Sequence, residues 1–277
     1  MKTISLSCAL LLSLFVQAQY YYKDIIGTKE TTGIIKVYKN NKVTRVVVNT
    51  FDGEGVKSDD FYIEQQFSLP DSRLKTITRS GEDNASVLTA YADGEGRVIK
   101  TVDSTQNLIS TTTYQYDGDG RLRNILSNTI DSSKRINETE EHQWMYENNA
   151  VSRMLRIKNK LDTAIVTFKL DNSGNVSEEQ SERKGVKSDP VYYYYDAQNR
   201  LTDIVRFNNR SRRLLPEYMF EYSPANQVIQ RITVPANSSD YTIWRYQYDG
   251  TGLKIREAVY DKYKQLTGKI EYVYQRG

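Results

Sequence analysis

The stretch YQYDGDGRLRNI occupies residues 114–125, and a near copy, YQYDGTGLKIRE, occupies residues 246–257. A third full copy, YYYDAQNRL, spans residues 193–201. The shared pattern is aromatic-x-aromatic-Asp, two further residues, Gly or Asn, and then often Arg-Leu. A phrase repeated this closely indicates that the chain is built from copies of one local unit.

Weaker copies fill the intervals between the three full ones, at a spacing of 24 residues from Asp93 to Asp117 and 25 from Asp171 to Asp196. The stretch from Asp117 to Glu147 is longer, which predicts a polar insertion at 131–142. About ten periods would then cover the chain. The weaker copies lie at 67–74, 91–98, 144–149, 168–176 and 220–228, with a shorter-turned copy at 37–43 and half a copy at 272–274.

The motif has the chemistry of a β-hairpin turn. Asp favours the first position of a type I turn, where its carboxylate accepts backbone N–H groups ahead of it. The fourth residue must then adopt a positive φ, which Gly adopts freely and Asn tolerates. The residues expected to form these structural turns are Asp93, Gly96, Asp117, Gly120, Asp171, Gly174, Asp196, Asn199, Asn226, Asp249 and Gly252.

The segments on either side of each turn read as strands. In TTTYQYD (111–117) the residues Thr112, Tyr114 and Tyr116 share one face, and Thr113 and Gln115 share the other. Each period is therefore two strands and two turns. We expect an all-β fold, an antiparallel β-meander or spiral sheet built from about ten such hairpin repeats, with no helix.

These residues closely resemble the YD repeats of the rearrangement-hotspot (Rhs) family, which includes Tc-toxin cocoon subunits and teneurins. The resemblance implies a sheet that winds as a β-spiral, which in long arrays closes into a shell around a toxin cargo. The core block and toxin domain of the large family members are missing here. The resemblance therefore implies a short array that does not close, with residues 23–33 and the final YVYQRG as caps or docking edges.

The first residues have the features of a secretory signal peptide. Lys2 precedes the apolar run 9–16, and Val16-Gln17-Ala18 places small residues where signal peptidase needs them. We expect a signal peptide over 1–18 and a single repeat domain over 19–277. Cys8, the one cysteine, would leave with the signal. Export would place the protein in the periplasm, at the outer surface or outside the cell.

Charge and hydropathy narrow the classes of partner. The chain has 38 Lys+Arg against 35 Asp+Glu, spread without a basic stripe, so we expect no nucleic acid partner. No other apolar run approaches membrane length, and charges occur on both faces of the expected strands. We therefore expect a protein that does not span a membrane, as a helix or as a barrel.

The candidate chemistry is sparse. Asp117-Gly118-Asp119-Gly120 resembles part of a calcium loop, but Arg121 follows where an acid cluster would be needed, so a plain turn is the interpretation. His142 is expected in an exposed loop. We predict no catalytic residue, no cofactor and no metal site. The tyrosines at 20–22 and 192–195 are the first candidates for stacking on sugars.

The function expected is an exported, non-catalytic repeat scaffold that binds a glycan or an envelope protein. Repeat arrays present the extended surfaces that such binding uses. One alternative is an accessory or remnant of an Rhs-like toxin system. Another is a glycan-active enzyme, a glycoside hydrolase that uses carboxylates of the turns.

Overall fold

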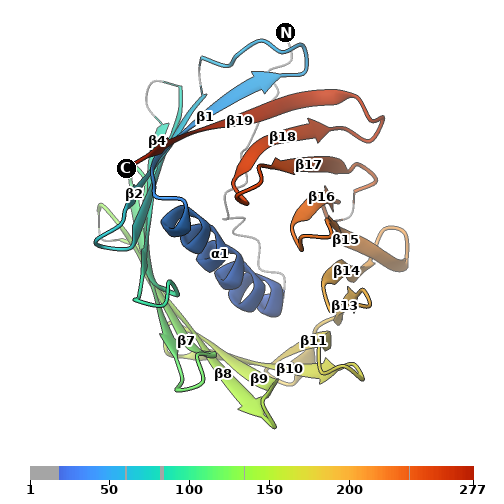
Figure 1. Cartoon of the computed structure of the whole chain (residues 1–277). Coiled ribbons are helices and arrows are strands. Elements are labelled where there is room, and N and C mark those ends of the chain that lie inside the picture. Colours follow the sequence, from blue (N-terminus) through green and yellow to red (C-terminus); the bar gives the residue numbers. More distant parts are fainter. Residues whose placement is uncertain (1–18, 60, 82–83, 134, 237) are drawn as a thin grey trace.

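The computed structural model describes residues 19–59, 61–81, 84–133, 135–236 and 238–277, and the expected signal peptide 1–18 lies outside them. The chain folds into one antiparallel sheet that closes on itself around an N-terminal helix (Figure 1). The expectation of an all-β fold without a helix is therefore wrong in one respect. The helical part is a π-helical segment, η1 (Tyr21–Ile26), followed by α1 (Gly27–Asn40).

The strands follow one another around the wall in the order of the sequence. The first nine are β1 (Val43–Asp52), β2 (Phe61–Ser68), β3 (Arg73–Ser80), β4 (Asn84–Ala92), β5 (Val98–Ser104), β6 (Leu108–Tyr116), β7 (Leu122–Asp131), β8 (Asn137–Glu147) and β9 (Ala150–Lys158). The others are β10 (Asp162–Leu170), β11 (Val176–Arg183), β12 (Val186–Lys187), β13 (Val191–Tyr195), β14 (Leu201–Asn208), β15 (Arg213–Tyr222), β16 (Val228–Thr233), β17 (Thr242–Tyr248), β18 (Lys254–Tyr260) and β19 (Leu266–Arg276).

The sheet closes because β1 pairs with β19 as well as with β2. The closing register runs from Val43 opposite Arg276 to Asp52 opposite Gly268. The array is thus a closed barrel, not an open spiral, and the final YVYQRG belongs to the closing strand instead of a cap. Closure removes the edges on which an open sheet would aggregate.

The number of strands in the wall is even, as a ring of antiparallel strands requires. β12 and β13 both pair with β11, at Glu182 opposite Lys187 and at Glu179 opposite Val191. They are therefore two parts of one interrupted strand, and the nineteen strands occupy eighteen positions. Pro190 lies in the interruption, where its missing N–H costs no ladder hydrogen bond.

The helix lies inside the barrel, where Ile35 and Tyr38 are buried among wall residues (Figure 1). Val37–Val43, expected as a first hairpin copy, is instead the end of α1 and the start of β1. Thr31, Thr32, Ile34, Ile35 and Val37 give α1 a weak helix propensity, so burial by the barrel has to stabilise it. None of the helices in the described ranges is long and apolar enough to cross a membrane.

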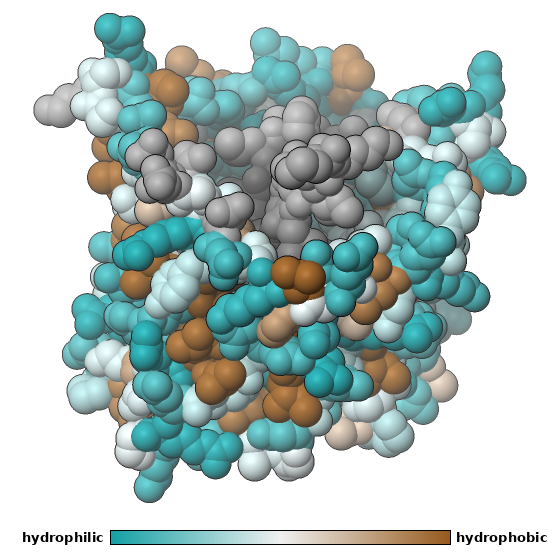
Figure 2. All heavy atoms as spheres, turned by 90° about the horizontal axis from the view of Figure 1, so that it is seen from above, coloured by the Kyte–Doolittle hydropathy of each residue, from teal (hydrophilic) through white to brown (hydrophobic). Residues whose placement is uncertain are grey.

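The apolar core faces the lumen, and the outer face of the wall carries charges. On the outside, Arg45 pairs with Glu64, Lys169 lies 2.8 Å from Glu178, and Arg256 lies 3.3 Å from Glu271. On the side shown in Figure 2, hydrophobic residues occur singly or in small groups among hydrophilic ones. Toward the helix the wall is therefore largely apolar with a few buried charged groups, and toward the outside it is mixed.

Closure can be tested at a pair of identical tetrapeptides, DGEG at 52–55 and at 93–96. A Cβ atom at Gly53 would overlap the carbonyl oxygen of Leu266 in the closing strand, whereas one at Gly94 meets no atom within 4 Å. We expect Gly53→Ala to lower the free energy of unfolding by about 1–3 kcal/mol, because the crowded backbone must shift. Gly94→Ala should stay within about 0.5 kcal/mol of the parent in the same urea titration. Equal effects of the two variants would contradict the closed register.

Candidate functional site

The motif turns all lie at one end of the barrel, which we call the motif rim. There the carboxylate of Asp117 accepts the N–H of Asp119 at 3.0 Å and that of Arg121 at 2.9 Å, and Gly120 has φ 75°. The other turns repeat this arrangement around the rim. The residues with positive φ in them are Gly96, Gly120, Gly174, Asn199, Asn226 and Gly252.

Neighbouring repeats are joined by the arginine that follows the turn. The Nε of Arg200 donates to Asp196 at 2.7 Å, and its guanidinium lies 4.8 Å from the ring centroid of Tyr222 in the next repeat. The Tyr222 hydroxyl in turn donates to the carbonyl of Leu201 at 2.8 Å. Burial raises the pKa of Tyr222 to about 12, so this hydroxyl remains a donor. The repeated letters Asp, Arg and Tyr therefore describe one contact between adjacent hairpins.

The same contact recurs along the sheet. Arginine stacking of this kind joins Arg97 to Tyr116 and Arg121 to Tyr146. The tyrosine-to-carbonyl bond occurs even where the arginine is replaced. Its further copies run from Tyr116 to Val98, Tyr146 to Leu122, Tyr195 to Val176, Tyr248 to Val228 and Tyr274 to Lys254.

The one histidine lies inside the barrel, so its placement in an exposed loop was wrong. The residues expected as an insertion at 131–142 are the end of β7, a short turn and the start of β8. The Nδ1 of His142 lies 2.6 Å from Asp24 of η1, and its Nε2 lies 3.0 Å from Glu140. Trp144 also donates its Nε1–H to Asp24, at 3.2 Å. His142 therefore links the helical segment to the wall.

This cluster carries opposite charges at close range. Burial acts to lower the pKa of His142, but the carboxylates of Asp24 and Glu140 outweigh it and raise the pKa to about 9. Burial acts to raise the pKa of Glu140, but hydrogen bonds from His142 and Arg156 lower it to about 2. At neutral pH the imidazole is therefore charged and engaged on both nitrogens. Such a group holds two elements together and has no free nitrogen for proton transfer to a substrate.

A second buried carboxylate holds the start of the helical segment. Glu179 is 0% exposed and accepts the backbone N–H groups of Tyr20 and Tyr21, each at 2.9 Å. It also accepts the hydroxyl of Tyr193 at 2.8 Å. Burial raises the pKa of Glu179. A carboxylate at this position satisfies N–H groups that the first turn of a helix leaves without partners.

The tyrosines proposed for sugar stacking, at 20–22 and 192–195, do not form one surface in the structure. Tyr21 lies 5.4 Å from Tyr193 and Tyr22 lies 5.3 Å from Tyr218, as ring centroids inside the barrel. The rings of residues 20–22 therefore pack against the wall and are only partly exposed. In β13 the side chains alternate, so Tyr193 is buried and Tyr194 is 50% exposed.

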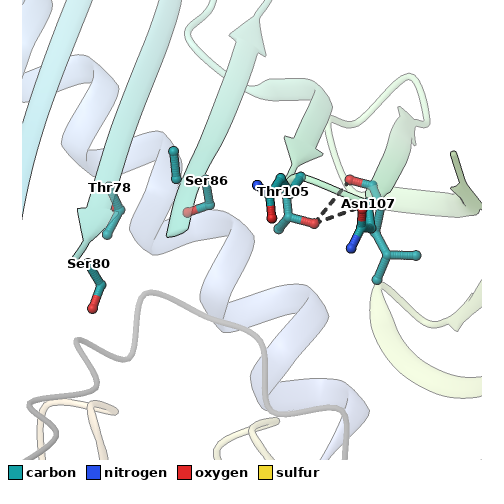
Figure 3. A pocket seen from close by; sticks show the side chains of 8 residues that line it. Thr78, Ser80, Ser86, Thr105 and Asn107 are labelled. Carbon is teal, nitrogen blue, oxygen red and sulfur yellow. Dashed lines mark hydrogen bonds between the residues drawn. The ribbon is translucent and has the colours of Figure 1, made fainter. Parts of the chain in front are cut away.

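A hollow lies at the opposite rim, away from the motif turns (Figure 3). Its volume is about 420 Å³. The ends of β3 and β4 and the loop between β5 and β6 form it. That loop is held by the N–H of Thr105, which donates to the carbonyl of Leu108 at 2.9 Å. The lining residues are Thr78, Ser80, Ala85, Ser86, Thr105, Gln106, Asn107 and Leu108.

Six of the eight described lining residues carry a hydroxyl or an amide group, and none of the eight has a charged side chain. Thr78 lies directly opposite Ser86 in the β3–β4 pairing, so their hydroxyls are on the same face (Figure 3). Such a surface offers both donors and acceptors to a neutral polar ligand. Within the described ranges, no group of three or more His, Cys, Asp or Glu side chains is arranged to hold a metal ion. No sequence motif marks the residues of this pocket, so the pattern of the sequence does not predict it.

No protein-family model and no curated protein matches the chain. Among solved structures, a porin-like protein from Bacteroides uniformis is similar at 10% identity and a TM-score of 0.39, over 84% of this chain and 98% of that one. A porin-like protein from Bacteroides vulgatus has 13% identity and a TM-score of 0.25 over the same shares. A chain of a TcdB2–TccC3–Cdc42 crystal structure has 13% identity and a TM-score of 0.32, over 82% of this chain but 16% of that one.

The His142 cluster predicts a pH-dependent stability. A histidine whose pKa rises from 6.5 unfolded to about 9 folded stabilises fully below pH 6.5 and loses that contribution as the pH rises through 9. The loss should be about 3 kcal/mol in the free energy of unfolding, measured by urea titration across this range. Asp24→Asn should reduce the loss, because one of the two carboxylates is then neutral.

The control is Glu54→Gln, which neutralises an exposed carboxylate of the β1–β2 turn. This variant should retain the full pH dependence. An Asp24→Asn protein with the same pH dependence as the parent would show that the charged pair does not hold η1 to the wall.

Proposed function

We propose that this chain is an exported, non-catalytic barrel of the bacterial envelope that binds a neutral glycan at the opposite rim. The observation that carries the proposal is the pocket between the β3–β4 and β5–β6 ends, whose described lining residues are uncharged and mostly bear a hydroxyl or an amide. Its volume of about 420 Å³ suits a small ligand, since ligand pockets range from roughly 300 to 1,000 Å³. Sugars present the same mixed donors and acceptors.

The lining favours binding over hydrolysis. A glycosidase needs two carboxyl groups about 5–10 Å apart beside the scissile bond. Among the residues that the structure describes, none of those lining this pocket has a carboxyl group. The carboxylates of the motif turns lie at the other end of the barrel and are engaged by backbone N–H groups. Glycoside hydrolysis therefore remains the weaker candidate.

We also propose that the repeats are of the YD type, in a closed rather than a spiral form. The proposal is supported by the contact of Asp196, Arg200 and Tyr222, in which the repeated letters join adjacent hairpins. Such a relation to YD repeats would describe the origin of the barrel wall and would not by itself assign a function. The role of an accessory or remnant of an Rhs-like toxin system stays a prediction from the resemblance.

Isothermal titration with neutral oligosaccharides, selected on a glycan array, tests the binding. Thr78→Val with Ser86→Ala removes two hydroxyls from the pocket at nearly constant shape, and should weaken binding at least tenfold. The matched control, Thr89→Val with Thr163→Val, makes the same kind of change on the outer face of β4 and β10.

Equal affinity in the two double variants would contradict the pocket as the binding site. Release of a shortened glycan during the titration would contradict the non-catalytic role. A protein that captures no neutral glycan on the array would overturn the proposal itself.

A further inference from the structure

Four consecutive loops at the opposite rim each combine a cation with an exposed aliphatic side chain. These loops join β7 to β8, β9 to β10, β11 to β12 and β14 to β15, and they follow one another because the motif turns between them lie at the other end. Their aliphatic residues are exposed to 43% at Ile136, 89% at Leu161, 73% at Val186 and 48% at Leu214. The neighbouring cations are Arg135, Lys160, Lys184, Lys187, Arg212 and Arg213.

Turn geometry does not account for three of these cations. Lys160, Lys184 and Arg212 have φ of 60°, 51° and 54°. Gly or Asn adopts such a backbone at lower cost, and most turns of the motif rim use Gly or Asn there, although Ser72 and Lys42 at that rim also have positive φ. The opposite rim therefore carries charge where the backbone alone would favour another residue.

None of the same three cations forms an ion pair in the part of the chain that the structure describes, but the charge of Lys184 helps to lower the pKa of nearby Asp162. Their neighbours are paired: Lys158 lies 3.0 Å from Glu138, and Arg183 lies 2.6 Å from Asp162. Lys160, Lys184 and Arg212 are exposed and form no ion pair with any described residue. The charges of Lys160 and Arg212 are thus available to an external anion, whereas that of Lys184 is shared with Asp162.

We propose that this arc of four loops docks the barrel on the surface of an anionic lipid bilayer. Lysine and arginine beside a membrane each gain about 1 kcal/mol from anionic headgroups. An aliphatic tip beside each cation can enter the boundary between headgroups and acyl chains, where apolar contact adds to the attraction. An acidic polysaccharide would also bind the cations, but it offers no apolar layer for Leu161 and Val186.

The docking is peripheral, because it uses loop tips and not the wall. Charged residues such as Arg45, Glu64 and Glu178 lie on the outer face of the strands, where a spanning barrel would need an apolar band. With the arc on the membrane, the motif rim faces away from it. This inference does not depend on the glycan pocket, which lies at other loops of the same rim.

Vesicle co-sedimentation of the purified protein tests the proposal, with vesicles of phosphatidylcholine alone or mixed with one quarter phosphatidylglycerol. We expect binding to the anionic vesicles only, weakened by added salt. Lys160→Asn, Lys184→Asn and Arg212→Asn together should lower the binding constant at least tenfold. Since Asn tolerates positive φ, the triple variant should unfold at the same temperature as the parent or above it.

The matched control removes three cations from the motif rim, as Lys39→Gln, Lys42→Asn and Arg73→Gln, and should bind as the parent does. A second variant, Leu161→Ser with Val186→Ser, keeps every charge and should also bind more weakly. If both triple variants lost the same share of vesicle binding, net charge alone would explain the binding, and the docking arc would be overturned. A second result would also overturn it: the protein binds soluble polygalacturonate but not vesicles, and the Leu161→Ser, Val186→Ser variant binds polygalacturonate as the parent does. The partner would then be an acidic polysaccharide.

Discussion

Everything in this molecule depends on a sheet that closes around a filled lumen. A ring of about eight strands can be filled by its own side chains, but larger rings enclose space that needs other contents. Here eighteen wall positions surround η1 and α1, whose side chains and the wall tyrosines form the core. The burial of the helix therefore depends on the closure of β1 on β19.

Specific contacts decide how the helical segment is held. Glu179 binds its first N–H groups, and the pair of Asp24 with charged His142 fixes η1 against β8. A buried charge pair of this kind is costly to break from one side, because the remaining partner is left unpaired. The polar groups inside the barrel thus specify one position for a segment whose own helix propensity is low.

The sequence predicted the local units well and their closure badly. Tyr-x-Tyr-Asp followed by Gly or Asn indicates a hairpin because turn chemistry depends on neighbouring residues alone. Closure depends on contacts such as Val43 with Arg276, which no local pattern records. Gly27–Asn40 is rich in Thr, Ile and Val, so its local sequence gives little indication of the helix that the barrel buries. His142 was misplaced for a related reason, since Asp24, its partner, is distant in the chain.

The two rims have different compositions and, on our proposals, different roles. At the motif rim the aspartate, arginine and tyrosine side chains contact one another between repeats, so they hold the wall together. At the opposite rim the hydroxyl-lined pocket and the unpaired cations remain available to partners. The residues that repeat in the sequence are thus structural, and the candidate binding surfaces use residues that do not repeat.

The most direct test of the closed barrel is a cysteine pair across the closing strands. Val47 lies opposite Val273 in the β1–β19 register, and Cys8 is the one native cysteine. With Cys8→Ser as background, Val47→Cys and Val273→Cys together should oxidise to an intramolecular disulfide, because paired strands bring their Cα atoms to about 4.5–5.5 Å. Mass spectrometry should then find a monomer with one crosslinked peptide. A monomer with two free thiols, or a dimer linked between chains, would contradict closure and restore the open spiral.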